Sequence, residues 1–186
     1  MPVPRAEPRR GQSFVGLLLV LLVLTLLTAF AAPRVDLSRF RSDAIARQAV
    51  SVFASAARTA RQRRTDVVVR VDSARRRLGT LEDRNGNGGP DGGEREVWTD
   101  LDPTAELRDP PVRLPLPAAR GAGAETESAA GRVAFHPAGG ASADLVLYLT
   151  SDPAQPSAWR AVQVSRRTGG VQLWRFDGAR WTRGRT

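Results

Sequence analysis

The sequence predicts an α+β protein, in which a long N-terminal hydrophobic helix continues into an amphipathic helix packed on an antiparallel β-sheet domain. Three observations predict this order of elements. Residues 12–33 form an uncharged apolar run, and residues 34–64 carry an apolar stripe at helical spacing. Residues 65–186 contain short β-branched or aromatic stretches separated by turn residues. The length of 186 residues suits one domain with additional segments.

The composition excludes several classes of function. The 28 basic residues are all Arg, and with 19 acidic residues they give a net charge of +9. Cysteine is absent, which excludes disulfides, thiolate metal sites and cysteine nucleophiles. His136 is the single histidine, so a site built on several histidines is excluded too. The sequence shows no nucleophile elbow, phosphate loop or paired catalytic carboxylates, and we expect a non-enzymatic protein.

The uncharged run at residues 12–33 has the length and composition of a membrane-crossing helix. A helix of about 22 residues is about 33 Å long, and the hydrocarbon core of a bilayer is about 30 Å thick. The run contains eight Leu, three Val and two Phe. These side chains favour insertion by roughly 4–8 kcal/mol. We therefore expect a single transmembrane helix here, although arginines on both sides of it leave its orientation undecided by charge.

Two processing sites compete around this run. Ala29-Phe30-Ala31 follows it closely and is typical of a secretory signal cleaved after Ala31. The other site precedes the run, between Gly11 and Gln12, where a basic segment ends.

The second pattern, Arg9-Arg10-Gly11 followed by Gln12-Ser13-Phe14, resembles the class III signal of type IV pilins and type II secretion pseudopilins. The resemblance implies a leader at residues 1–11, cleavage by a prepilin peptidase after Gly11, and methylation of the new N-terminus at Gln12. It also implies that the following helix first anchors the chain in the membrane and then packs in a fibre. Pro33 matches the family's usual proline at the twenty-second mature position, where it disturbs the helix.

The positions that the resemblance assigns to helix assembly are Phe14, Gly16 and Pro33. In the family the fifth mature residue is nearly always Glu, and here it is Gly16. A buried carboxylate in lipid is costly and is retained for function. The departure therefore indicates a minor subunit with an unusual place in the fibre or a divergent one, and it also favours the alternative of a secretory signal.

The helix expected at residues 34–64 leads into the β-rich part. Its apolar stripe is formed by Ile45, Ala49, Val52, Phe53, Ala56 and Ala60. An Ala- and Arg-rich helix end followed by the strand Val67–Val71 resembles the GspH/FimT group of minor pseudopilins. Further strands are expected at Glu96–Leu101, Arg132–His136, Leu145–Thr150, Trp159–Ser165 and Val171–Phe176. The last two are expected to form a hairpin through Gly169.

Residues 79–131 differ from the rest of the β-rich domain because they are rich in Gly, Pro and acidic residues, and we expect a loop region. Within it, Asp83, Asn85, Asn87, Asp91 and Glu94 fit the spacing of a calcium loop. Side-chain oxygens at alternate residues can equally stabilise a turn by bonding to backbone N–H groups. Both alternatives are open at the level of sequence, and no other cofactor is expected.

The sequence thus predicts a minor pseudopilin-like subunit with its β-rich domain outside the cytoplasm, anchored once in the inner membrane. Its expected partners are other pilin or pseudopilin subunits, the prepilin peptidase and the membrane. Two alternatives remain. The mature chain carries 25 Arg and 18 acidic residues, so an Arg-rich minor pilin that binds DNA during uptake is one. A secreted domain released after Ala31 is the other.

Overall fold

A computed structural model describes residues 14–31, 37–115 and 131–184. The chain divides into two units, Met1–Asp36 and Leu37–Thr186, which are described separately. The first contains α1, Phe14–Ala31, an uncharged helix whose Leu side chains from Leu17 to Leu24 are exposed. Among the described residues, no helix has both the length and the apolar character needed to cross a membrane. The ends of the run expected at residues 12–33 lie outside the described part of the chain.

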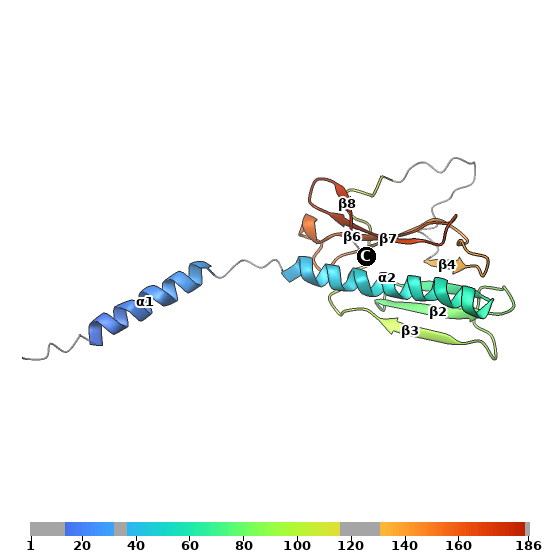
Figure 1. The fold of residues 1–186 in the computed structure, drawn as a ribbon, viewed down its shortest axis with the longest axis horizontal. Coiled ribbons are helices and arrows are strands. Elements are labelled where there is room, and N and C mark those ends of the chain that lie inside the picture. The colour runs from blue at the N-terminus through green and yellow to red at the C-terminus, as the bar shows by residue number, and fades with distance from the viewer. Residues whose placement is uncertain (1–13, 32–36, 116–130, 185–186) are drawn as a thin grey trace, which may run out of the picture. The chain divides into compact units, whose positions relative to one another are not determined.

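The second unit begins with α2, Leu37–Arg63, which extends along both sheets of the domain (Figure 1). The six residues of the expected apolar stripe are all buried. Many of its buried positions are alanines, so the helix backbone can approach the sheets closely. Arg64 then takes a left-handed conformation, with φ of 55°, which ends the helix and directs the chain into the first strand.

Two antiparallel sheets, rather than one, pack on α2. The first has the order β3-β2-β1-β4, and the second has the order β5-β6-β7-β8. The strands of the first are β1 Asp66–Asp72, β2 Arg77–Asp83, β3 Glu96–Asp100 and β4 Arg132–Phe135. Those of the second are β5 Leu145–Leu149, β6 Arg160–Val164, β7 Val171–Phe176 and β8 Trp181–Arg183, with the short helix η1 Pro156–Ala158 before β6. The strands expected from sequence are present, with ends that differ by one residue or so.

The main core lies between α2 and the inner faces of both sheets. Phe53 of α2 meets Phe135 of β4 edge to face, with ring centroids 6.4 Å apart. A second, smaller core covers the outer face of the second sheet, where Tyr148 and Phe176 pack around Trp181. The second sheet is therefore apolar on both faces, which fits the dense run of β-branched and aromatic residues in its sequence.

The loop region expected at residues 79–131 differs from what is observed, because residues 79–83 belong to β2. Gly79 weakens the strand pattern in the sequence. The structure explains it, since a Cβ at Gly79 would lie 2.9 Å from the ring of Trp98 on β3. Glycine is required there so that the indole can lie against the β2 backbone.

Candidate functional site

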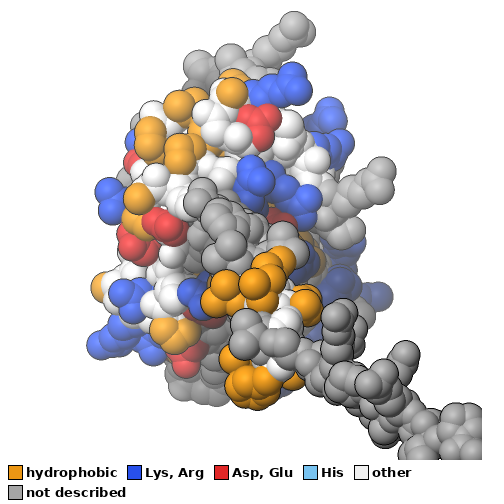
Figure 2. All heavy atoms as spheres, turned by 90° about the vertical axis from the view of Figure 1, so that its left-hand side faces the viewer, with side chains coloured by type: hydrophobic (Ala, Val, Ile, Leu, Met, Phe, Trp, Pro, Cys, Tyr) orange, Lys and Arg blue, Asp and Glu red, His pale blue; other side chains and the backbone are white. Residues whose placement is uncertain are grey.

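The first turns of α2 expose apolar side chains to solvent. Leu37 is 59% exposed and Phe40 is 64% exposed. Ala44, one turn further, is exposed on the same side of the helix. Figure 2 faces this end of the second unit and shows hydrophobic side chains gathered on it. We call Leu37, Phe40 and Ala44 the α2 apolar face, and it is the feature of this domain best suited to contact another apolar surface.

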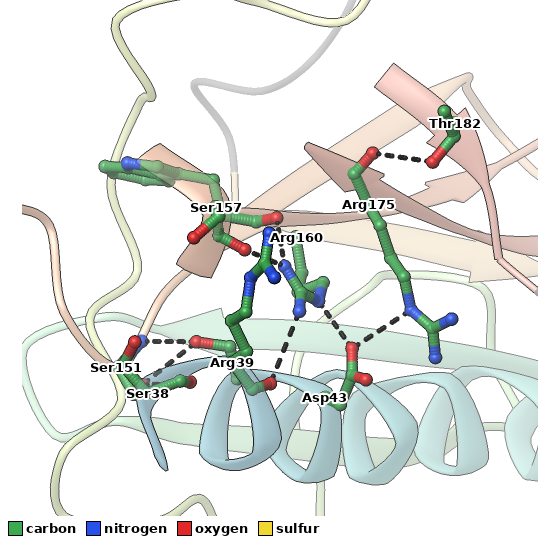
Figure 3. Close-up of polar contacts among 10 residues, drawn as sticks. Ser38, Arg39, Asp43, Ser151, Ser157, Arg160, Arg175 and Thr182 are labelled. Atoms are coloured by element: carbon green, nitrogen blue, oxygen red, sulfur yellow. Dashed lines mark hydrogen bonds and ion pairs between the residues drawn. The ribbon is translucent and has the colours of Figure 1, made fainter. Parts of the chain in front are cut away.

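A partly buried charge cluster fixes this end of α2 to the second sheet (Figure 3). Asp43 of α2 accepts hydrogen bonds at Oδ1 from Nε of Arg160 on β6 and from Nε of Arg175 on β7, at 2.5 and 3.1 Å. The Arg160 side chain is 4% exposed and the Asp43 side chain is 19% exposed. We call these three residues the Asp43 cluster. It joins the second turn of the helix to two adjacent strands.

Most N–H groups of the Arg160 side chain donate a hydrogen bond. Its Nη1 donates to the backbone carbonyls of Ser157 and Trp159 at 2.7 and 2.8 Å, and Nη2 donates to the carbonyl of Arg39 at 3.3 Å. Burial lowers the pKa of Arg160, while the bond to Asp43 opposes that shift. The guanidinium still carries its charge, because arginine side chains are not deprotonated in proteins.

Serine side chains add a second attachment beside this cluster. Ser151 donates its backbone N–H to Oγ of Ser42 and its own Oγ–H to the carbonyl of Ser38, at 2.9 and 2.8 Å. Ser42 is fully buried. These hydrogen bonds hold the first two turns of α2 in place. The α2 apolar face is therefore exposed on a helix that is fixed to the domain.

The structure describes part of the assembly and cleavage residues predicted from sequence. Phe14 and Gly16 lie in the first turn of α1; both are exposed, and a Cβ at Gly16 would have no atom within 4 Å. Gly11, Gln12 and Pro33 lie outside the described residues.

The predicted calcium residues come together in the loop between β2 and β3, where their oxygens accept hydrogen bonds from the loop itself. Asp83 accepts from two backbone N–H groups at 2.7 Å, and Glu94 accepts from two more at 2.8 and 3.1 Å. Asp91 accepts from the side-chain amides of Asn85 and Asn87. Within the described part of the chain, no group of three or more His, Cys, Asp or Glu is arranged to hold a metal ion. The geometry is that of a turn stabilised by its own side chains.

The tryptophans are used mainly for packing. Trp159 is buried, and Trp174 donates from Nε1 to Gln163 at 2.9 Å. Trp98 carries two guanidinium groups against its ring, with Arg77 at 4.1 Å and Arg70 at 5.3 Å from the centroid. Stacked arginines and buried rings leave little aromatic surface for the bases of a single-stranded nucleic acid.

Sequence reasoning missed the Asp43 cluster. Asp43 and Arg160 are 117 positions apart, and Asp43 stands among several other charged residues, Arg39, Arg41 and Arg47. The one local signal is a charged residue at the start of an otherwise apolar strand, since Arg160 is followed by Ala161 and Val162. In a strand whose side chains alternate between two faces, such a charged residue lies at the edge of the core. It needs a partner there, because burying an unpaired charge is costly.

Comparison with known proteins gives a single structural likeness to report. No family model matches the chain, and no curated protein matches it. The minor pseudopilin EpsH from the Type 2 Secretion System of Vibrio cholerae has a solved structure that aligns with this chain at a TM-score of 0.47 and 16% identity. The alignment covers 72% of this chain and 95% of that one.

Proposed function

We propose that this chain is a minor pseudopilin-like structural subunit, assembled into a type II secretion pseudopilus or a type IV pilus after a prepilin peptidase removes residues 1–11. Its role is assembly rather than catalysis. The observation that carries the proposal is the order of segments. A basic leader ends in Gly11, an uncharged run follows at residues 12–33, and α2 then packs lengthwise on antiparallel sheets.

The uncharged run supports anchoring in the inner membrane followed by packing in a fibre. The described part of the run, α1, has no charged side chain on any face. Such a helix can exchange lipid contacts for contacts with the apolar helices of other subunits, because both environments are equally nonpolar and packing decides between them. Gly16 leaves open space beside the α1 backbone, which permits close approach of a neighbouring helix.

The α2 apolar face supports a second contact with partner subunits, outside the membrane. Leu37 and Phe40 expose large apolar side chains one turn apart on the same side of the helix, and neighbouring exposed apolar side chains suit a contact with a partner. In the proposed subunit this face continues the interaction of the anchor helix into the domain, which lies outside the cytoplasm.

The mature N-terminus tests the proposal. Mass spectrometry of the chain from cells with and without prepilin peptidase should show a start at Gln12, methylated, only when the peptidase is present. Gly11→Val should block this cleavage. Gly16→Ala, which adds a methyl group where no atom lies within 4 Å, is the matched control and should be processed normally. A start after Ala31 would replace the proposal with an exported domain, and an uncleaved chain would leave a membrane anchor without a fibre.

Incorporation into a fibre tests the role of the α2 apolar face. Phe40→Ser should reduce recovery of the chain in sheared fibres while leaving its unfolding temperature unchanged, because the ring is exposed. Val112→Ser is the control, since Val112 is also exposed, at 49%, but lies on a different segment. Equal recovery of the two variants would remove this face from the assembly contacts.

A further inference from the structure

Four residues, three of them with side chains, form one row across the outer face of the first sheet. Arg132 of β4 pairs in register with Arg70 of β1, Arg70 with Gly79 of β2, and Gly79 with Trp98 of β3. Their neighbours along the strands, such as Val69, face the core under α2. Because side chains alternate along a strand, the row lies on the face of the sheet opposite α2.

The row places two arginines directly opposite each other on adjacent strands. Like charges in this arrangement are destabilising unless something neutralises them. Arg70 has a partner, because its Nη2 lies 2.8 Å from Oε1 of Glu96. Arg132 is exposed, and the structure gives its side chain no hydrogen bond or ion pair with any described residue. Within the described part of the chain, one positive charge is therefore left uncompensated beside another guanidinium.

A cavity of about 420 Å³ lies at this point of the sheet. Its lining includes both arginines, Trp98, the hydroxyl-bearing Ser73 and the backbone at Gly88 and Gly131. Glycine at Gly88 keeps the loop clear of Arg132, since a Cβ there would lie 3.4 Å from Nη1. The carboxylate of Asp72 also lines the cavity, and it is paired with Arg77 at 3.0 Å. The cavity thus combines a free guanidinium, polar groups and an aromatic wall.

We propose that this cavity binds an oxyanion, a carboxylate or phosphate group, carried on a larger organic molecule. Arg132 supplies the main contact, because its planar guanidinium can hold such a group through two parallel hydrogen bonds. Arg70 contributes its charge, and the anion removes the repulsion between the two arginines. The volume falls within the range of small-molecule pockets and exceeds the need of a bare ion, so the remainder of the ligand occupies the rest of the cavity. The proposal rests only on residues of the first sheet and its adjoining loops. It does not depend on the proposed role in fibre assembly.

Thermal unfolding of the full chain in detergent tests the site. Replacing chloride with millimolar inorganic phosphate at constant ionic strength should raise the unfolding temperature by about 3–5 °C at ten times the dissociation constant. Arg132→Gln should abolish this rise, and in chloride it should unfold at the same temperature as the parent chain or higher. Arg167→Gln, at an exposed position in the turn between β6 and β7, is the matched control and should keep the full rise.

Two results would overturn the proposal. An equal rise in all three proteins would show a general salt effect of phosphate. Unfolding of Arg132→Gln at a lower temperature in chloride would show that Arg132 has an attractive partner within the chain.

Larger probes define the ligand class. Glucose 6-phosphate and a dicarboxylate such as glutarate should bind more tightly than inorganic phosphate, because they fill more of the cavity. Affinity no greater than that of phosphate would refute the larger organic group, and a response to DNA alone would refute the small-molecule site.

Discussion

Replacing Asp43 by Asn should strongly destabilise the domain, because the change leaves Arg160 buried without its counter-charge. Breaking a buried ion pair by removing one partner costs about 3–5 kcal/mol. Here the Asp43 side chain is 19% exposed, and Arg160 keeps its bonds to three backbone carbonyls. We therefore expect a loss of about 2–3 kcal/mol in the free energy of unfolding, or about 5–10 °C in unfolding temperature.

The assay is urea unfolding of the full chain in detergent, followed by circular dichroism and tryptophan fluorescence. Asp109→Asn is the matched control, because Asp109 and Arg113 form an ion pair at 2.6 Å whose side chains are 52% and 70% exposed. Exposed ion pairs contribute about 0.2–1 kcal/mol. The double variant Asp43→Asn with Arg160→Met should be less destabilised than Asp43→Asn alone, since the stranded charge is gone. Equal stability of Asp43→Asn and Asp109→Asn would refute the argument.

Three further predictions concern separate parts of the domain. Burial raises the pKa of Tyr148, which accepts a hydrogen bond from the Leu114 N–H at 2.9 Å, so the phenolate absorbance of this single tyrosine should appear above pH 10 in the folded chain and near 10 in denaturant. Because the folded state holds the proton more tightly, stability present below pH 10 should be lost as pH rises through the raised pKa, and Tyr148→Phe should remove that loss. Asp83→Ala should lower stability by about 2–3 kcal/mol by leaving two backbone N–H groups without their acceptor, whereas chelation of calcium should change nothing; a calcium-dependent rise in unfolding temperature would restore the calcium alternative. Gly79→Ala should lower the unfolding temperature by displacing Trp98, and an unchanged temperature would show that the indole moves without cost.

The features that sequence predicted well are those set by local periodicity and turn chemistry. The stripe from Ile45 to Ala60 repeats at helical spacing, and each of its residues is buried under the sheets. The hairpin of β6 and β7 turns through Gly169 at φ of 63°, a conformation that favours glycine. In both cases a few neighbouring residues contain all the information, so no knowledge of distant contacts is needed.

The features that sequence missed depend on partners far along the chain. The composition of residues 79–131 predicts loop, whereas residues 79–83 belong to β2 and contribute Gly79, Glu82 and Asp83, which are poor strand residues. Each has a distant reason for its identity. Trp98 requires the glycine, Arg63 of α2 pairs with Glu82 at 2.9 Å, and the following loop uses Asp83 as its acceptor. The same residues that weaken the strand signal are therefore the ones that determine how the strand is placed.

The calcium pattern shows the limit of spacing as evidence. The spacing from Asp83 to Glu94 brings five oxygen-bearing side chains into one loop, as the pattern requires. Whether those oxygens face an ion or the loop's own N–H groups depends on backbone conformation. Gly86 and Gly88, both at positive φ, turn their N–H groups toward Asp83. Spacing therefore predicts which side chains meet, whereas backbone conformation decides what they bind.

The two ends of α2 are attached to different sheets, and this arrangement accounts for its mixed sequence. Near its start, Asp43 bonds to Arg160 and Arg175 of the second sheet. At its end, Arg63 pairs with Glu82 of the first sheet. An apolar stripe alone would pack on either sheet in several registers, because burial is not directional. The two charge contacts select one register, which leaves the α2 apolar face directed to solvent. A partner subunit that binds this face would therefore meet a helix already fixed at both ends, and binding would not require ordering the helix.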